Sequence, residues 1–483
     1  MLNRRTFLAA SATGVSLTPV PALAQGAGAT PAAPVTRTRR DVSSTAAAGD
    51  LAKYRSAVAQ LIVLPASDPR HWNKLAQQHD DHCPHSNWWF LPWHRAYLYY
   101  FERVCQDILK DPTFALPYWD WTQNPRIPGP FWSGVLAGNG VKPPVSRLIA
   151  PNEDIPSEFV GRKVIDRFLG DTQLVTPFST APRPVAGRAM AQRDPGNTGL
   201  LEGTPHNNVH NQIDGTMGTF LSPLDPIFWL HHANVDRLWA SWSALHGGAT
   251  PTQAEWGALN LESFWDAVTQ KSVSEPASRT KSLDPYGYTY DRLDRPTQAP
   301  QGLAGPIGAL FPSLQVSELM KLQGHLVLAS AFPSTVKVNA GQMTALKTTA
   351  AFDNVVRQNV RVTEPTRPVT LLLENVVIPP GRRIALRVFL NCKDPSLASP
   401  IDDPSYVGTV APFGQGHQHT ATPAAPTGVS FALDATETLN RLTAIGGYKP
   451  GVVDVALVVT SSDPKSAGVV VRPGQVALVS TGT

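Results

Sequence analysis

The sequence predicts a multi-domain α+β protein with a mainly α-helical domain, built on a four-helix-bundle core, followed by a C-terminal β-sandwich. Two observations predict this order. Apolar and aromatic residues recur at spacings of three and four around two histidine-rich segments in the first half of the chain. After a segment rich in Pro, Gly and Ala, this pattern gives way to short runs of β-branched residues. A length of 483 residues suits two or three domains.

The N-terminus has the pattern of an export signal. Arg4 and Arg5 precede a short, mostly apolar run that ends in Ala-Leu-Ala at 22–24, as in a twin-arginine signal with an Ala-x-Ala cleavage site. We expect a signal peptide over 1–24, a flexible leader over 25–45, and a folded protein delivered to the periplasm or the medium. An ordinary secretory signal is the alternative. No other apolar stretch is long enough for membrane insertion.

Charge and cysteine content exclude several classes of protein. The net charge of +4 is mild and forms no basic stripe, so nucleic acid is not an expected partner. Three cysteines are too few for a disulfide framework. Cys105 and Cys392 are expected as two buried free thiols, with a disulfide between them as the alternative.

Eight of the 13 histidines fall in two clusters. The first cluster contains His79, His82, His85 and His94, and the second contains His206, His210, His231 and His232. Imidazole is the commonest metal ligand and suits copper, zinc, iron and nickel. Three ligands from each cluster would leave open positions on two metal ions, which is typical of catalytic rather than structural sites.

The second cluster predicts two helices that face one metal ion. His206 and His210 are four residues apart and therefore share one helical face, and Pro205 is expected in the first turn of that helix. The run from 225 to 242 also has helical periodicity, which directs His232 toward the same ion.

One turn beyond His232, Asp236 is expected to orient a ligand histidine or to hold Arg237.

The two clusters resemble the copper motifs of a known family. Cys83-Pro-His85 and Trp93-His94-Arg95 resemble the first copper motif of bacterial tyrosinases and of polyphenol oxidases. Glu202, His206-Asn207 and the run Asp225-Pro-Ile-Phe-Trp-Leu-His231-His232 resemble the second. The resemblance covers most of the chain and implies a coupled dinuclear (type 3) copper site with O2 as co-substrate.

The resemblance implies six metal ligands. The first copper ion is assigned His79, His85 and His94, and the second His206, His210 and His232. His82 competes with His79, which is preferred because its lead-in from Trp72 matches the family. His231 is implied as a hydrogen-bonded neighbour rather than a ligand, since adjacent residues on a helix point about 100° apart. A thioether bond between Cys83 and His85 is also implied, with an unmodified, packed cysteine as the alternative.

Three further residues take roles from the resemblance. Glu202 and Asn207 are implied to hold a water molecule as a general base for phenol deprotonation, although Glu202 also suits a helix N-terminus without catalysing anything. Phe220 is implied as the gate that partly covers the first copper ion. The loop here is one residue shorter than in plant relatives, which leaves Thr219 as the alternative.

The expected boundaries follow composition and resemblance. The dicopper catalytic domain is expected over 46–292, a linker over 293–325 and the C-terminal β-sandwich over 326–483. The motif Gly287-Tyr-Thr-Tyr290 resembles the one that closes the family's catalytic domain, where it pairs with an arginine, here Arg39 or Arg40.

The C-terminal segment resembles the shielding domain of plant polyphenol oxidases, including the stretch from Tyr406 to His417-Gln-His419. The resemblance implies that this domain covers the copper site and makes the enzyme latent. His417 and His419 are expected as surface-loop histidines, with copper handling as the alternative.

The sequence thus predicts ortho-hydroxylation of monophenols and oxidation of o-diphenols to o-quinones, with small phenols and O2 as partners and room for a copper chaperone. An oxidase limited to catechols or o-aminophenols is the near alternative. A haemocyanin-like oxygen carrier is disfavoured because the copper unit is not repeated. A dinuclear zinc hydrolase is disfavoured because it would usually have carboxylates among its ligands, whereas these clusters are almost purely histidine.

Overall fold

The computed structural model describes residues 36–297, 369–377, 383–395, 398–413, 428–448, 452–461, 470–471 and 474–481, together with the backbone of strands β5 (His325–Ala331), β6 (Val336–Lys337) and β7 (Ala345–Ala351). The predicted signal peptide, most of the predicted linker, and His417 and His419 lie outside the described residues.

The first part of the chain is mainly helical. Its α-helices are α1 (Ala48–Ile62), α2 (Trp72–His82), α3 (Phe90–Leu109), α4 (Ser157–Val160), α5 (Arg162–Gly170), α6 (Val175–Phe178), α7 (Asn207–Ile213), α8 (Ile227–Leu245) and α9 (Ala254–Ala258). Short strands β1 (Arg37–Arg39), β2 (Asn260–Asp266), β3 (Lys271–Pro276) and β4 (Tyr288–Tyr290) accompany them. The helix expected over 225–242 is therefore confirmed.

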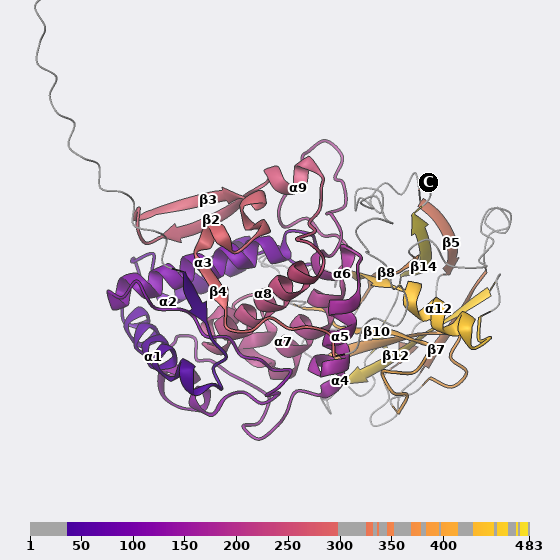
Figure 1. Cartoon of the computed structure of the whole chain (residues 1–483), viewed down its shortest axis with the longest axis horizontal. Coiled ribbons are helices and arrows are strands. Elements are labelled where there is room, and N and C mark those ends of the chain that lie inside the picture. Colours follow the sequence, from indigo (N-terminus) through magenta and orange to yellow (C-terminus); the bar gives the residue numbers. More distant parts are fainter. Residues whose placement is uncertain are drawn as a thin grey trace, which may run out of the picture. The chain divides into compact units, whose positions relative to one another are not determined.

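Helices α3 and α8 form the centre of the helical part, where they contact each other directly (Figure 1). Every residue of α8 from Ile227 to Trp242 is buried, as expected for a helix that is enclosed on all sides. The rings of Phe101 on α3 and Trp229 on α8 stack with centroids 3.5 Å apart. This aromatic contact holds together the two helices that carry His94 and His232.

A buried ion-pair cluster closes the helical part at its N-terminal strand. β1 pairs with β4 in parallel, which places the Arg39 guanidinium 3.7 Å from the centre of the Tyr288 ring. Arg39 also donates to the Tyr290 hydroxyl (3.2 Å), whereas Arg40 turns outward to Asp50. Arg39 is thus the arginine of the tyrosine motif.

Asp236 belongs to this cluster, and the partner predicted for it is wrong. Its carboxylate accepts from Arg95 (2.6 Å) and from the hydroxyls of Tyr288 and Tyr290 (2.6 Å each). Arg237, about 100° further around the helix, instead pairs with Asp294 (3.1 Å). Asp236 therefore stabilises the core and orients no ligand histidine.

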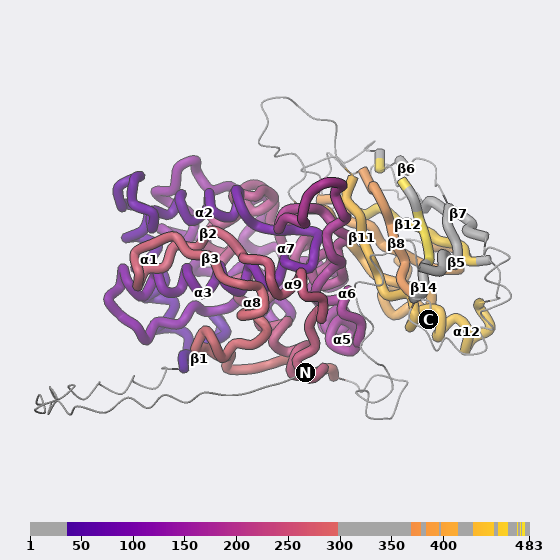
Figure 2. Tube along the Cα trace, turned by 90° about the horizontal axis from the view of Figure 1, so that it is seen from above, coloured from indigo at the N-terminus to yellow at the C-terminus, as the bar shows by residue number. Residues whose placement is uncertain are grey.

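The C-terminal part contains two four-stranded antiparallel sheets. Its further elements are β8 (Val369–Val376), β9 (Ile384–Leu390), β10 (Tyr406–Val410), β11 (Val429–Asp434), α12 (Thr436–Ala444), β12 (Val452–Ser461), β13 (Val470–Val471) and β14 (Gln475–Thr481). The strand orders are β10-β9-β12-β7 and β11-β8-β14-β5, and Figure 2 shows β11 beside β8. β9 is buried along its whole length, which confirms a β domain with a shared core.

Hydrogen bonds join the two parts at β10 and β11. The Thr198 amide donates to the Ser430 carbonyl (2.7 Å), and the Ala432 amide donates to the Thr198 carbonyl (2.9 Å).

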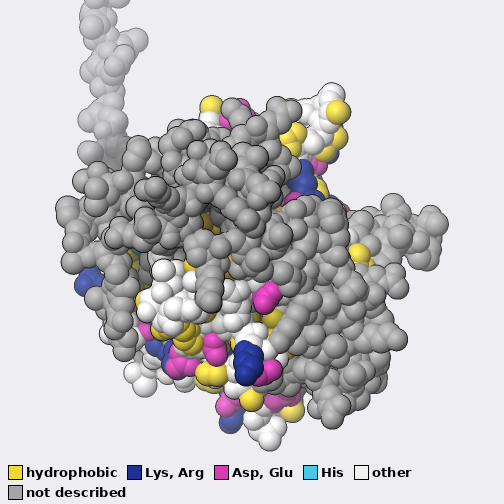
Figure 3. All heavy atoms as spheres, turned by 90° about the vertical axis from the view of Figure 1, so that its right-hand side faces the viewer, with side chains coloured by type: hydrophobic (Ala, Val, Ile, Leu, Met, Phe, Trp, Pro, Cys, Tyr) yellow, Lys and Arg dark blue, Asp and Glu magenta, His cyan; other side chains and the backbone are white. Residues whose placement is uncertain are grey.

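On the face that Figure 3 shows, the described Lys and Arg side chains lie beside Asp and Glu rather than gathering together. Among the described helices, none combines the length and apolar character needed to cross a bilayer.

Candidate metal centre

Four helical segments and one loop supply the histidines of the centre. His79 lies in the last turn of α2 and His94 in the first turn of α3, with His85 on the loop between them. His210 lies on α7 and His232 on α8.

His206 lies at the end of a π-helical turn, η4 (Glu202–His206), which runs directly into α7. Pro205 stands inside this turn rather than in a first α-helical turn as predicted. Proline has no N–H to donate and its ring crowds the carbonyl four residues earlier, so the helix widens locally. Such π turns often occur at functional sites.

In the first cluster, His79, His85 and His94 bring one ring nitrogen each to within 4.8 Å of one another. The Nδ1 of His79 donates to the Phe220 carbonyl (2.6 Å), and the Nδ1 of His94 donates to the Phe90 carbonyl (2.8 Å). Neutral rings that donate from Nδ1 carry no proton on Nε2. The Nε2 atoms of His79 and His94 nevertheless face each other at 3.3 Å.

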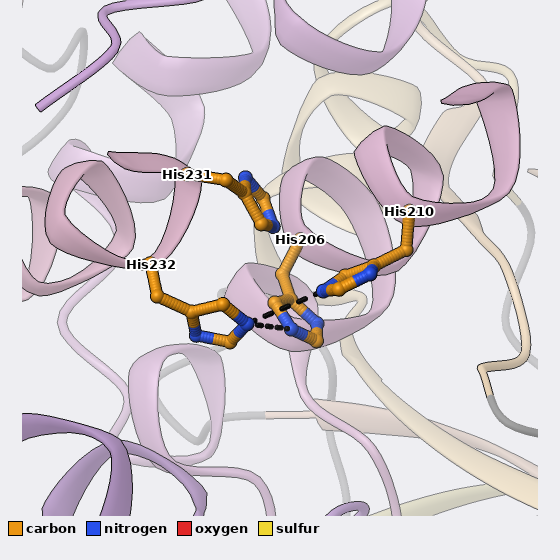
Figure 4. A group of neighbouring side chains, drawn as sticks. All are labelled: His206, His210, His231 and His232. Atoms are coloured by element: carbon orange, nitrogen blue, oxygen red, sulfur yellow. Dashed lines mark hydrogen bonds between the residues drawn. The ribbon is translucent and has the colours of Figure 1, made fainter. Parts of the chain in front are cut away.

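The second cluster repeats this geometry. His206 donates from Nδ1 to the Asn207 side-chain oxygen (2.8 Å), and His210 donates from Nδ1 to the Met217 carbonyl (2.7 Å). Their Nε2 atoms lie 3.3 and 3.2 Å from the Nε2 of His232, and Figure 4 shows the three rings converging.

The donor set fits metal ions. Two unprotonated nitrogens at 3.3 Å repel each other, and a cation between them removes that repulsion. Separations of 3.2–3.3 Å are also those of imidazoles that bind one ion at about 2.0–2.1 Å. The carbonyls that accept from Nδ1 orient the rings, as outer partners of metal-bound histidines generally do.

Burial keeps all of these histidines neutral, which is the form that binds metals. It lowers the pKa of His94 and of His210 to about 3, even though each ring donates to a backbone carbonyl. Burial likewise moves the pKa of His79, His85, His206 and His232 well below the ordinary value.

The two clusters lie side by side. The rings of His94 and His232 stack with centroids 4.4 Å apart and an interplanar angle of 12°. The rings of His85 and His206 also stack, at 5.7 Å. The arrangement thus suits a dinuclear centre with three imidazoles per ion.

His231 also brings a ring nitrogen to within 4.8 Å of those of the second cluster, but its hydrogen bonding differs from that of the other histidines. Its Nδ1 accepts from the Trp121 indole (3.1 Å), so the neutral ring carries its proton on Nε2. In Figure 4 no dashed line reaches His231, although its ring lies close to that of His206. His82 is half-buried and lies outside both clusters.

Glu202 begins the turn η4 that carries His206, and both of its carboxylate oxygens accept hydrogen bonds. One oxygen accepts from the Ser86 amide (2.6 Å) and the other from the Ser179 hydroxyl (2.8 Å). Burial raises the pKa of Glu202 to about 8, although both hydrogen bonds lower it. The Asn207 amide donates to the Ala411 carbonyl (2.6 Å) of the C-terminal part rather than toward Glu202.

Phe413 is a site residue that the sequence analysis did not find. Its ring lies 4.3 Å from the ring of His210 and 4.8 Å from that of His85, between the two clusters. Phe220 lies 5.4 Å from the rings of both His85 and Phe413, which supports Phe220 over Thr219 as the gate position. The only signal for Phe413 was its place in the 406–419 stretch that resembles plant shielding domains.

The three cysteines are free, so the Cys105–Cys392 disulfide is absent. Cys392 is half-buried rather than buried. Cys83 is buried, and its Sγ lies 3.4 Å from Nδ1 of His85.

Comparison with known proteins identifies relatives for most of the chain. The family model "Common central domain of tyrosinase" matches residues 66–191 and 186–245, and a domain of unknown function (DUF7868) matches 323–480. A tyrosinase from Streptomyces glaucescens is 36% identical over 41% of this chain and 76% of its own length. Tyrosinase HcTyr1 from Hahella sp. (strain CCB-MM4) is 27% identical over 82% of this chain and 83% of that protein.

Solved structures show the same fold. Latent apple tyrosinase has a TM-score of 0.63 at 22% identity and covers 92% of this chain and 98% of its own. Recombinant latent aurone synthase, a polyphenol oxidase, has a TM-score of 0.65 at 21% identity, with coverage of 94% and 91%.

Proposed function

The chain belongs to the tyrosinase family of copper-dependent phenol oxidases, and on that premise we propose that it both hydroxylates monophenols and oxidises o-diphenols to o-quinones, in a latent form. One observation carries the proposal: the aromatic ring of Phe413 lies between the two histidine clusters. A phenol would have to enter this same space between the clusters to reach metal ions held there, and in this structure the protein's own side chain fills it.

The protein positions the substrate, excludes water from the site and orients the metal ligands. Copper, when bound, supplies the O2 and electron-transfer chemistry that none of these side chains can provide. The six imidazoles are neutral, and four of them (His79, His94, His206 and His210) are held in orientation by hydrogen bonds from Nδ1 to oxygen atoms. Phe90 and Phe228 pack against the cluster rings and exclude water.

We assign proton removal from the monophenol to Glu202, acting through a water molecule that Asn207 orients. An ordinary phenol has a pKa near ~10, so a base close to the second ion lowers the barrier to binding. Because burial raises the pKa of Glu202 to about 8, the carboxylate gains affinity for a proton. In the closed structure one N–H of the Asn207 amide donates to the Ala411 carbonyl, and the amide has a second N–H that can hold the water molecule.

A diphenol-only oxidase is the second candidate, and the same contacts favour it. Both Glu202 oxygens already accept hydrogen bonds from Ser86 and Ser179, and a catechol requires less help with its proton than a monophenol does. Comparison of O2 uptake with tyramine and with 4-methylcatechol separates the two candidates.

We also propose the thioether between Cys83 and His85. The buried thiol lies 3.4 Å from the His85 ring, and a covalent bond would hold that imidazole, which sits on a loop, in one orientation. The S–H bond of Cys83 and one ring C–H bond of His85 break as the C–S bond forms, and O2 accepts the two electrons and two hydrogen atoms. The peptide that contains both residues therefore loses two hydrogen atoms, which mass spectrometry can detect. An unchanged mass in the copper-loaded protein would contradict it.

Export by the twin-arginine route, with copper delivered by a chaperone before transport, is our proposal for the N-terminal segment. It rests on Arg4, Arg5 and the Ala-x-Ala at 22–24. Replacement of both arginines by lysine should leave the protein inside the cell, and unchanged export would contradict the route.

The decisive experiment measures O2 uptake by the copper-loaded protein with tyramine and with 4-methylcatechol, before and after limited proteolysis within 298–324. We expect activity on both substrates that rises after cleavage. Activity on the catechol alone would support the diphenol-only oxidase. Reversible O2 binding without turnover of either substrate would contradict the enzyme and favour an oxygen carrier.

A further inference from the structure

Two hydrogen bonds fix the carboxylate of Glu202, and their donors come from two separate segments. Ser86, on the loop that carries His85, donates through its backbone amide (2.6 Å). Ser179, at the end of α6, donates through its hydroxyl (2.8 Å). Because Glu202 is buried, these two donors rather than bulk water determine where its oxygens lie.

Both donors hold a backbone conformation that serine rarely adopts. The φ angle is 59° at Ser86 and 64° at Ser179. With a ψ angle of −171°, Ser179 lies in a region that is populated almost only by glycine. Such conformations cost free energy and persist where the surrounding structure imposes them, commonly at functional sites. The chain nevertheless has serine at 179, and the serine hydroxyl is the group that reaches Glu202.

One short segment, residues 196–199, lies against both serines. The Gly196 amide donates to the Ser86 carbonyl (2.8 Å), and the Thr198 hydroxyl donates to the Ser86 hydroxyl (2.8 Å). The Gly199 amide donates to the Ser179 hydroxyl (2.9 Å). The segment therefore holds the two residues that hold Glu202.

Strand β11 of the C-terminal part fixes this segment from its other side. The Thr198 amide donates to the Ser430 carbonyl (2.7 Å), and the Ala432 amide donates to the Thr198 carbonyl (2.9 Å), so that Thr198 forms a parallel bridge with Phe431. Thr198 is fully buried. Its main chain is bound to β11, while its side chain is bound to Ser86.

Helix α6 gives β11 a second route to the same carboxylate. Val175 on α6 and Ala432 on β11 belong to one buried apolar cluster. The Ser179 amide donates to the Val175 carbonyl (3.0 Å), which ties the hydroxyl donor to this helix. Both donors to Glu202 are thus supported by the same strand.

We propose that Thr198 and Ser179 are positioning residues for Glu202, and that both take their positions from β11. This inference rests on the proposed function, in which Glu202 removes the proton of a monophenol. The C-terminal part then acts on the centre in two separate ways, because Phe413 blocks the site whereas β11 holds the base in place. An opened site hydroxylates monophenols best while β11 stays docked, and oxidation of diphenols depends on β11 far less.

The first test uses the uncleaved, copper-loaded chain with Phe413→Ala, which lacks the blocking ring. In this chain, Thr198→Val removes the hydroxyl but keeps the main-chain bonds, and Ser179→Ala removes the other donor. Each change should lower tyramine hydroxylation by about two- to ten-fold, as expected for one hydrogen bond, and leave 4-methylcatechol oxidation nearly unchanged. Thr198→Ser keeps the hydroxyl and should restore the rate. Thr280→Val, which removes an equally buried hydroxyl bonded elsewhere, is the matched control.

The contact itself can be measured without copper or turnover. Hydrogen exchange, followed by mass spectrometry on the copper-free Phe413→Ala chain, reports on the Ser86 amide that Glu202 protects. Thr198→Val should speed exchange in the peptide that contains Ser86 by about two- to ten-fold. Thr198→Ser and Thr280→Val should not. Equal exchange in all of these chains would contradict the link from Thr198 to Glu202.

The role of β11 is tested by cleavage of the Phe413→Ala chain within 298–324. The blocking ring is already absent, so cleavage should change 4-methylcatechol oxidation little. Release of β11 should lower the rate with tyramine relative to that with 4-methylcatechol. An unchanged ratio would contradict the role of β11, and so would tyramine hydroxylation that begins only after cleavage.

The two substrates distinguish failure of the inference from failure of the proposed function. If Thr198→Val lowers both rates equally or neither, or if Thr198→Ser does not restore the rate with tyramine, the inference is overturned and the function stands. If neither the Phe413→Ala chain nor its cleaved form hydroxylates tyramine, the proposed monophenol activity fails, and the inference falls with it.

Discussion

Replacement of Phe413 by alanine is expected to convert the latent protein into an active one without any proteolysis. The side chain is 8% exposed and its ring contacts those of His85, His206, His210 and Phe220. Alanine keeps the main-chain hydrogen bonds that residues 409–413 make with the helix of the second cluster. It removes only the ring that fills the space between the clusters.

The magnitude follows from the burial of that ring. Deletion of a buried phenylalanine side chain in a protein interior costs about 3–5 kcal/mol. Here the loss falls on the closed state, because the open state exposes the ring to water. At about 1.4 kcal/mol per factor of ten, the fraction of open protein rises by about 100- to 5,000-fold. The gain is capped by the activity of the fully cleaved protein.

The assay is O2 uptake with 4-methylcatechol by the uncleaved, copper-loaded chains. The matched control is Phe389→Ala, which removes an equally buried phenylalanine whose ring contacts Tyr406 and none of the cluster histidines. We expect strong activation by Phe413→Ala and much weaker activation by the control. Equal activation by both would mean that general loosening of the C-terminal part opens the site, and would refute the assignment of Phe413 as the plug. No activation by either variant would refute latency through residues 409–413.

Four further outcomes are expected. In the cleaved protein, Glu202→Gln should lower tyramine hydroxylation by about 100-fold or more and 4-methylcatechol oxidation far less; an equal loss on both substrates would mean a structural role. Because burial raises the pKa of Glu202 to about 8, the native tyramine rate should rise as the pH passes through that value and its carboxyl ionises. Metal analysis should find that His231→Asn retains both copper ions and that His232→Asn loses one, and the reverse result would exchange their roles. Burial, together with the charge of Asp434, raises the pKa of Asp171 to about 8, and burial raises the pKa of Asp434. The two carboxyls therefore contribute fully to the docking of the C-terminal part on the helical part below the ordinary carboxyl pKa. This contribution is lost as the pH rises toward about 8 and the carboxyls ionise. The activity of uncleaved relative to cleaved protein should therefore increase over this range, and a pH profile unchanged by Asp434→Asn would exclude the pair.

The local patterns of the chain predicted much of the helical part and the β-rich part. The spacing of His206 and His210, and the apolar run that carries His232, required helices because helical periodicity is a property of neighbouring residues. The β-branched runs at 369–376 and 384–390 required strands for the same reason. The chemistry of the clusters also followed from residue type, since clusters that are almost purely histidine suit a narrow set of metals.

Contacts between distant residues came only from the tertiary structure. Asn211 and Pro412 are 201 residues apart in the chain. No local pattern indicates that residues 409–413 reach the helix of the second cluster or that Phe413 enters the centre. The partners of Asp236 come from three other segments, so its place one turn after His232 misled the prediction. The protons on the histidine Nδ1 atoms are likewise held by carbonyls whose positions depend on the packed fold. Periodicity determines which face of an element a residue occupies, whereas packing against the rest of the chain determines what that face meets.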